Sequence, residues 1–289
     1  MSKTIIFSFD IEEWFNTSFM GDYIPKELRS ESRIDINLEY PLMLLEKYKV
    51  PATFFVLGSL AKQKKHIIER ILRADPRHEI ASHSYEHELV FEMNPKEIRR
   101  NLSDSKKLLE DLSGAKVLGY RAPYFSIDDR AVETLCELGY EYDSSLHDFR
   151  LNPQYGHLNL PMKSTNVPGI FTYKTITEVT IPVKRYFKFL KFPFGGGGYF
   201  RLYPLKLQLH WLKSFLKTSD YFLMYMHPWE FDPDQPYLNN VPLLHRKRHY
   251  LGIKDQYNKV DKMLQHLKDE GYEFDTLANY LIRKSFFRY

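Results

Sequence analysis

The chain has 289 residues, and its 43% hydrophobic and 27% charged content is ordinary for a globular protein. A formal net charge of +4 is too small to indicate a nucleic-acid partner, and the single cysteine, Cys136, excludes an internal disulfide. The N-terminal apolar run is too short for a signal peptide, and no apolar stretch approaches the roughly 20 residues of a membrane-spanning helix. We therefore expect a cytoplasmic protein, with contact at the inner membrane surface left open.

Strands and helices alternate through the first half of the chain. Apolar alternation and short apolar runs predict five strands, at Lys3–Phe9, Ala52–Leu57, Glu79–Ser82, Lys116–Tyr120 and Tyr140–Asp143. Helical spacing and capping residues predict helices between them, at Ile34–Tyr48, from Gly58 through Leu72, from Pro95 to about Leu112, and from a cap in Ser126–Asp129 to near Gly139. This alternation indicates parallel βα units and hence an α/β fold.

The second half of the chain is less regular. We expect a proline-bearing loop at Asn152–Gly169 and a strand at Tyr173–Pro182. The glycine run Gly195–Gly198 leads into a helix through Trp211, and a further strand follows at Tyr221–Met226. A second proline-bearing loop follows, and then a helix at Lys254–Glu270, a short strand at Tyr272–Phe274 and a closing helix at Thr276–Arg283. Without an internal repeat or a linker, we predict one domain over residues 1–289 with an irregular insertion at about 150–218.

Polar residues that can carry chemistry follow several of the predicted strands, namely Asp10, His83, Arg121, Asp143 and His227. In parallel α/β folds, reactive side chains gather at the C-terminal ends of the strands. We therefore expect these residues to converge on one site.

His83 and His87 are the first candidates for metal ligands. A spacing of four on one helical turn would put both imidazoles on the same face. Two histidines with one carboxylate leave positions open for water and substrate, as a catalytic divalent metal requires. Without the acidic cluster within Asp10–Glu13, the pair would be equally typical of surface or capping histidines.

The carboxylates of that cluster are Asp10, Glu12 and Glu13. They repel one another unless a cation compensates, and Asp10 ends an apolar strand, where an unpartnered carboxylate is costly. Along an extended chain Asp10 and Glu12 project to one side and Glu13 to the other. We therefore favour Glu12 over Glu13 as the metal ligand, with Asp10 beside it as general base.

Arg121 and His227 complete the candidate site. An arginine at a strand end can hold a carboxylate through two parallel hydrogen bonds, so we expect Arg121 to keep Asp10 ionised and oriented. His227 can donate a proton near neutral pH, which suits a general acid. Taken singly, each has a plainer interpretation, as a surface arginine and a structural histidine.

Two segments of the second half also stand out. Gly195–Gly198 is not followed by Gly-Lys-Ser/Thr, so it is no phosphate loop and favours a sharp turn or a close approach of the backbone to a ligand. Lys184–Lys191 mixes cations with aromatic residues. A solvated surface is the default interpretation of this segment, and an anionic or lipid-linked substrate or a membrane surface is the alternative.

The motifs resemble those of the polysaccharide deacetylase family, carbohydrate esterase family four, whose shared unit is the NodB-homology domain. The matching segments occur in the family's order, at Ser8–Trp14, His83–His87, Arg121–Tyr124 and Met226–Pro228. The Asp-Ile-Glu-Glu start, together with Gly195–Arg201 and the ending His227-Pro228-Trp229, resembles the branch associated with bacterial exopolysaccharide biosynthesis.

The sequence departs from the family pattern in two places. Ile11 stands where the family's first motif has the second of two adjacent aspartates, so the ligand position shifts to Glu12 or Glu13. The family's acidic fourth motif has no clear counterpart, and its nearest candidates are Asp143 and Glu178.

The resemblance implies a distorted (β/α) barrel and a metal-dependent N-deacetylase acting on an N-acetylated saccharide, with a lipid-linked substrate left open. It implies a divalent metal held by Glu12, His83 and His87, with Zn²⁺ favoured over Co²⁺, Ni²⁺ and Mn²⁺. Asp10 would then act as base, His227 as acid, and the backbone N–H of Tyr124 as oxyanion donor. The alternatives are a C–N hydrolase of a non-sugar amide and a non-catalytic carbohydrate-binding protein.

Overall fold

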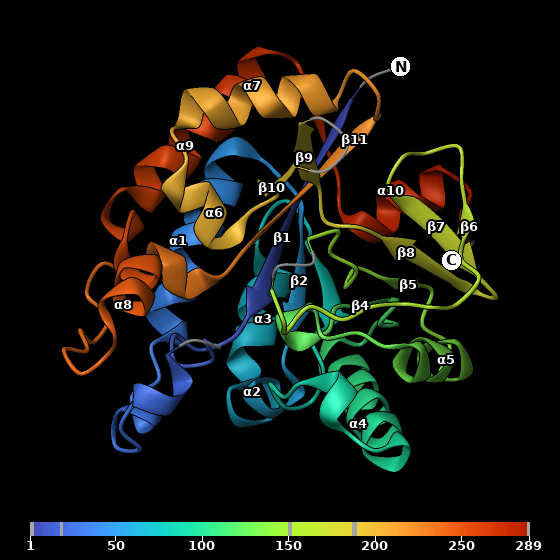
Figure 1. Ribbon diagram of the computed structural model, residues 1–289, viewed down its shortest axis with the longest axis horizontal. Coiled ribbons are helices and arrows are strands. Elements are labelled where there is room, and N and C mark those ends of the chain that lie inside the picture. Colours follow the sequence, from blue (N-terminus) through green and yellow to red (C-terminus); the bar gives the residue numbers. More distant parts are fainter. Residues whose placement is uncertain (1–2, 18–19, 150–151, 187–189, 288–289) are drawn as a thin grey trace.

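The computed structural model describes residues 3–17, 20–149, 152–186 and 190–287 (Figure 1). Its strands are β1 (Thr4–Ile11), β2 (Ala52–Val56), β3 (Glu79–Ser82), β4 (Gly119–Tyr120), β5 (Tyr142–Asp143), β6 (Lys163–Ser164), β7 (Ile170–Tyr173), β8 (Ile176–Val179), β9 (Val183–Tyr186), β10 (Leu190–Pro193), β11 (Tyr221–Met226) and β12 (Glu273–Phe274). Among the described residues the main sheet has the order β11–β1–β2–β3–β4–β5–β8–β7–β6, and β12 also pairs with β1.

The strands from β11 through β8 run parallel, whereas β7 and β6 extend the sheet antiparallel. A separate hairpin is formed by β9 and β10. The α/β fold expected from the sequence is therefore confirmed, with a sheet that is mostly parallel.

Helices pack around this sheet (Figure 1). They are α1 (Ile34–Tyr48), α2 (Gly58–Gln63), α3 (Lys65–Arg73), α4 (Pro95–Ser113), α5 (Asp129–Glu137), α6 (Gly197–Leu202), α7 (Leu205–Phe215), α8 (Leu243–Tyr250), α9 (Ile253–Asp269) and α10 (Leu277–Arg283). Local chemistry fixes several of their starts, because the side chains of Asn94, Asp128 and Thr276 accept backbone N–H groups of the first turns of α4, α5 and α10.

Strand β1 is buried on both faces. Ile5, Phe7 and Phe9 belong to the larger apolar cluster, whereas Ile6 belongs to a second one that also includes Phe55. Because side chains alternate along a strand, Ser8 and Asp10 share the face of Ile6. The polar end of β1 is thus directed to the same side as the smaller core.

Several predicted bounds match the observed ones, as for the helix at 34–48 and the strands at 79–82 and 221–226. The predicted helix from Gly58 through Leu72 is instead two helices, because Lys64 leaves the helical region at φ −130°. The predicted strand Tyr173–Pro182 is wrong as one element, because Lys174 turns the chain at φ +48° between β7 and β8.

Several elements of the second half were not expected from the sequence, among them the β9–β10 hairpin. The proline-bearing loop after His227 contains α8, whose polar sequence lacks a clear apolar stripe, and the predicted loop Asn152–Gly169 contains β6. No helix in the described part of the chain is long and apolar enough to cross a membrane. The insertion at about 150–218 stays a prediction.

Candidate metal and catalytic site

The C-terminal ends of the parallel strands meet at one edge of the sheet. The register pairs Phe9 with Met226, Val56 with Ser82, and Ser82 with Tyr120, so the residues that follow these strands become neighbours. A cavity opens at this edge, and the predicted site residues that line it are Asp10, Glu12, His83, His87, Tyr124 and His227. Arg121 lies fully buried behind them.

Glu12, His83 and His87 form a compact group in which one candidate ligand atom from each residue lies within 4.8 Å of the others. Glu12 Oε2 is 2.5 Å from His87 Nε2 and 3.7 Å from His83 Nε2. The His83 Nδ1–H donates to the carbonyl oxygen of Arg121 at 2.9 Å, which leaves Nε2 as an acceptor facing Glu12.

The two histidines converge for a reason other than the predicted one. Residues 85–87 form a bend and the stretch 83–87 is not a helical turn, so the helical-face argument was wrong. Ser84 instead takes a left-handed conformation at φ +70°, and its carbonyl oxygen accepts the Gly58 N–H at 2.9 Å. The bend held in this way folds His87 back over His83, with ring centroids 5.4 Å apart.

The chemistry of this donor set fits a divalent metal. Burial lowers the pKa of His87 although Glu12 opposes the shift, and this favours the neutral imidazole that binds metals. Burial alone would raise the pKa of Glu12, but His87 and His227 reverse this and hold it well below its ordinary value. One carboxylate and two imidazoles match the three protein ligands of an open catalytic site.

Glu13 lies away from this group. Its carboxylate accepts the Arg33 N–H at 3.1 Å and the hydroxyl of Ser32. The opposite orientation of Glu12 and Glu13 agrees with the alternation expected for an extended chain, and it leaves Glu12 alone beside the two histidines.

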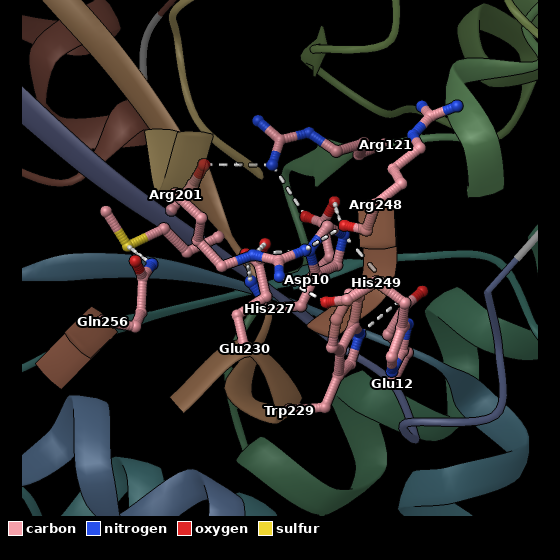
Figure 2. Close-up of polar contacts among 12 residues, drawn as sticks. Asp10, Glu12, Arg121, Arg201, His227, Trp229, Glu230, Arg248, His249 and Gln256 are labelled. Carbon is pink, nitrogen blue, oxygen red and sulfur yellow. Dashed lines mark hydrogen bonds and ion pairs between the residues drawn. The ribbon is translucent and has the colours of Figure 1, made fainter. Parts of the chain in front are cut away.

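Asp10 and Arg121 form a buried ion pair (Figure 2). Arg121 Nη1 donates to Asp10 Oδ1 at 2.7 Å and to Ser8 Oγ at 3.0 Å. Asp10 thus accepts one hydrogen bond from Arg121, whereas the sequence led us to expect two parallel hydrogen bonds. The other guanidinium nitrogens donate to the carbonyl and hydroxyl oxygens of Ser144, each at 3.1 Å. Asp10 Oδ2 is left toward the cavity, 3.8 Å from His227 Nε2.

Asp143 and Glu178, the two candidates for the fourth acidic motif, lie behind Arg121. They are register partners on β5 and β8, and both are buried. Burial raises the pKa of Asp143 to about 6, and burial together with Asp143 raises the pKa of Glu178 well above its ordinary value. Neither carboxylate lines the cavity among the described residues, so Asp143, like Arg121, is a strand-end residue that lies behind the cavity wall.

The acid that contacts His227 is Glu230, a residue that the sequence reasoning missed. Glu230 is fully buried, and its Oε2 accepts the His227 backbone N–H at 3.0 Å and lies 3.2 Å from His227 Nδ1. Its Oε1 accepts Arg201 Nε at 2.9 Å (Figure 2). The spacing of three after a histidine, within His227-Pro228-Trp229-Glu230, is the sequence signal that could have identified it.

The glycine run explains how Arg201 reaches this place. Gly196 has φ +140° and bridges to Tyr225, and a Cβ atom at Gly196 would lie 1.8 Å from the Tyr225 carbonyl oxygen. The backbone therefore touches β11 directly, and α6 begins beside His227. The backbone thus approaches a neighbouring strand closely, whereas the approach to a ligand expected for Gly195–Gly198 stays a prediction.

Trp229 is the second residue that the sequence reasoning did not place. Its ring stacks between the rings of His227 and His249, with centroid distances of 5.3 and 4.8 Å. Its Nε1–H donates to Glu12 Oε1 at 3.0 Å. Trp229 thereby links the candidate acid to the candidate metal ligand.

Tyr124 lies in the short 3₁₀ turn Pro123–Phe125 with φ +54°. Its ring packs edge-on against His87, with centroids 4.3 Å apart, and the residue lines the cavity. Its predicted role as a backbone oxyanion donor stays a prediction.

Two family models match adjoining parts of the chain. Residues 37–142 match the family described as polysaccharide deacetylase, and residues 144–281 match a domain of unknown function, DUF3473. The first match includes His83, His87 and Arg121, whereas Asp10 and Glu12 precede it and His227 lies in the second.

A peptidoglycan deacetylase from Helicobacter pylori is 29% identical to this chain over 165 residues. The aligned part is 54% of this chain and 54% of the Helicobacter protein, so the chain spans about half the length of this relative.

Two solved structures show the fold. A CE4 family pseudoenzyme from Bacillus anthracis has a TM-score of 0.54 and 17% identity, with 96% of this chain and 65% of that chain covered. A family 4 acetyl xylan esterase from Clostridium thermocellum, solved with a cobalt ion, has a TM-score of 0.52 and 16% identity, with 98% and 92% covered. The expected distorted barrel of the deacetylase type is therefore confirmed.

Proposed function

Because this chain carries a polysaccharide deacetylase domain of the NodB type, we propose that it is a metal-dependent hydrolase that removes an N-acetyl group from an amino sugar in a glycan. The observation that carries the proposal is the pairing within one cavity. Asp10 is held by Arg121 and His227 by Glu230, and the two pairs flank Glu12, His83 and His87.

Glu12 Oε2 and the Nε2 atoms of His83 and His87 would hold the metal. A bound Zn²⁺, or Co²⁺, Ni²⁺ or Mn²⁺ in its place, would lower the pKa of a coordinated water and polarise the acetyl carbonyl. Which of these ions binds is a matter for metal analysis of the purified protein.

Asp10 acts as the general base. Arg121 occupies Oδ1, so Oδ2 is the oxygen that accepts a proton from the attacking water. The guanidinium, buried with the carboxylate, fixes the direction of Asp10.

His227 acts as the general acid. Glu230 takes the Nδ1 side of the ring, so Nε2 faces the cavity and lies 3.8 Å from Asp10 Oδ2. As the C–N bond breaks, His227 donates a proton to the departing nitrogen, while the Tyr124 N–H donates to the acetyl oxygen. The products are acetate and a free amino sugar.

The proposed substrate is an N-acetylated saccharide, in keeping with the named substrate of the Helicobacter relative. The cavity has a volume of about 800 Å³ with its open mouth included and is lined by Tyr124, Tyr155 and Tyr199, whose rings suit the C–H faces of a sugar. We extend the proposal to exopolysaccharide biosynthesis, with a lipid-linked substrate and contact with a membrane surface. The cytoplasmic location expected from the sequence stays a prediction.

The test is acetate release from N-acetylglucosamine oligomers, measured with the metal-loaded protein. Asp10→Asn and His227→Gln should each lower kcat by about 10²-fold or more. Glu12→Gln should abolish stoichiometric Zn²⁺ binding. The matched control is Glu13→Gln, a neighbouring buried carboxylate that should leave both the metal and the activity in place.

Two outcomes would overturn the proposal. If the metal-loaded protein hydrolyses small cyclic amides but no N-acetylated saccharide, it is a C–N hydrolase of another class. If saccharide binding survives Asp10→Asn and the metal-loaded wild-type protein releases no acetate from any saccharide, it is a binding protein.

A further inference from the structure

The exposed apolar side chains of this protein are concentrated around α8. Of the nine large hydrophobic side chains that are exposed in the described part of the chain, five lie on this helix or beside it, namely Leu202, Tyr237, Leu243, Leu244 and Leu251. Leu244 is 77% exposed and Leu251 56% exposed. Single exposed leucines are ordinary on a protein surface, but such a concentration indicates an interaction site.

Contacts bring the members of this surface together. Leu244 and Lys247 are spaced at i and i+3 on α8, and Leu251 caps the end of the helix, where its N–H donates to the Lys247 carbonyl oxygen at 3.0 Å. Arg201 Nη1 donates to the carbonyl oxygen of Leu251, so Leu202 lies beside the end of α8. We call Leu202, Leu243, Leu244, Lys247 and Leu251 the α8 surface.

The charge of the helix shows what this surface can bind. The sequence of α8, Leu-Leu-His-Arg-Lys-Arg-His-Tyr, holds three cationic residues and no acidic one. Within the described ranges, neither Arg246 nor Lys247 forms an ion pair with a carboxylate, although Arg246 donates to the Asn239 carbonyl oxygen at 3.2 Å and lies over the Tyr237 ring. Leucines that insert and cations that stay among phosphates are the features of a helix that lies on an anionic lipid surface.

The basic segment noted in the sequence is a weaker candidate. Arg185 and Lys191 of the β9–β10 hairpin both pair with Asp148, and Lys184 donates to Ser214 Oγ at 2.7 Å. These cations are already engaged within the protein. Residues 187–189, the middle of the segment, lie outside the described residues.

The α8 surface also adjoins the cavity. Leu202 and Arg248 line it, and Figure 1 shows α8 beside α6 at the edge of the molecule. A protein resting on α8 would therefore hold its cavity mouth at the level of the lipid headgroups.

We propose that the α8 surface docks the protein onto an anionic membrane. The proposal gives the membrane contact of the preceding section a location, and it rests on that part of the proposed function and not on the hydrolytic chemistry. Substrate is absent from the binding test, so a failed acetate assay leaves the result of that test standing.

The experiment is co-sedimentation of the full chain with vesicles of phosphatidylcholine containing one quarter phosphatidylglycerol, compared with phosphatidylcholine alone. The wild-type protein should prefer the anionic vesicles and should be released by added salt. The double variant Leu244→Ser/Leu251→Ser should bind at least about tenfold more weakly, because burial of each leucine contributes to insertion.

The chain offers a matched control in Ile36→Ser/Met43→Ser. These two residues are also seven apart on a helix, α1, and each is 53% exposed. The charges beside them include the acidic Asp35, Glu39 and Glu46, which pair with Lys64 and Arg70, and the basic Lys47, which pairs with Asp261. This variant should sediment like the wild type, and both variants should release acetate from soluble oligomers at the wild-type rate.

Three results would overturn the proposal. The wild-type protein could ignore anionic vesicles, or the α8 and α1 variants could bind them equally well. The third such result is self-association of the wild-type protein in analytical ultracentrifugation that the α8 variant abolishes. The α8 surface would then be an interface between two copies of this chain.

Discussion

The indole N–H of Trp229 donates to Glu12 Oε1 at 3.0 Å, while Glu12 Oε2 faces His83 and His87. One oxygen of the carboxylate is thereby tied to the protein and the other is left for a metal. The same indole stacks on His227, so the proposed metal ligand and the proposed acid share one support.

Trp229→Phe should therefore weaken metal binding more than it weakens the fold. The phenyl ring keeps most of the stacking between His227 and His249 but loses the bond to Glu12. We expect about a tenfold rise in the Kd for Zn²⁺, the range found when the partner of a metal ligand is removed. Competition against a chelator measures it. Trp211→Phe is the control, since Trp211 donates to Tyr186, outside the cavity, and an equal effect in both variants would contradict the assignment.

Glu230→Gln should lower turnover with little change in substrate binding. The neutral amide no longer stabilises a charged His227, and the ring loses its fixed direction. We expect kcat to fall about 10- to 100-fold, with KM changed by less than about threefold. Steady-state acetate release measures both constants. Glu13→Gln, which also removes a buried carboxylate that accepts a backbone N–H, should leave kcat near wild type. A rise in KM at constant kcat would speak for a structural role alone.

The buried pair Asp143 and Glu178 should make the stability of the protein pH-dependent. Burial raises the pKa of Asp143 to about 6, above its value in the unfolded chain. The native state therefore keeps a proton that the unfolded state releases. The resulting stabilisation is fully present below about pH 4 and is lost as the pH rises through 6.

Glu178→Gln should reduce this dependence, because an amide can donate to Asp143 without titrating. Between pH 5 and 7 the wild type should lose at least about 1 kcal/mol of unfolding free energy relative to this variant. Urea unfolding at both pH values measures the difference. Glu137→Gln, at an exposed carboxylate, is the control and should follow the wild type. An equal difference in unfolding free energy between wild type and Glu178→Gln at pH 5 and pH 7 would show that this pair does not cause the pH dependence.

Gly196→Ala should be strongly destabilising. Its Cβ atom would lie 1.8 Å from the Tyr225 carbonyl oxygen, and φ is +140°. We expect a loss of about 3 kcal/mol or more in unfolding free energy. Gly21→Ala, which meets no atom within 4 Å, should change it by less than about 0.5 kcal/mol. Thermal unfolding of the two variants measures the contrast, and equal Tm values would refute the close contact.

Local pattern was sufficient for much of the fold and part of the site. Apolar runs and caps act within a few residues, so the helix at 34–48 and the strands at 79–82 and 221–226 could be read with their observed bounds. The alternation of an extended chain likewise separated Glu12 from Glu13, because it depends only on backbone geometry. Asp10, Arg121 and His227 were chosen because each follows a predicted strand, and the end of a strand can be located from local pattern alone.

Long-range packing decided the rest. His83 and His87 meet through a bend held by Gly58, and α8 forms without a clear apolar stripe of its own. Glu230 and Arg201 lie 29 residues apart, and their bond exists because Gly196 lets α6 touch β11. A spacing rule relates only residues that are close to one another along the chain. The partners of a buried charge come from wherever the fold places the compensating group, and that depends on all the contacts together.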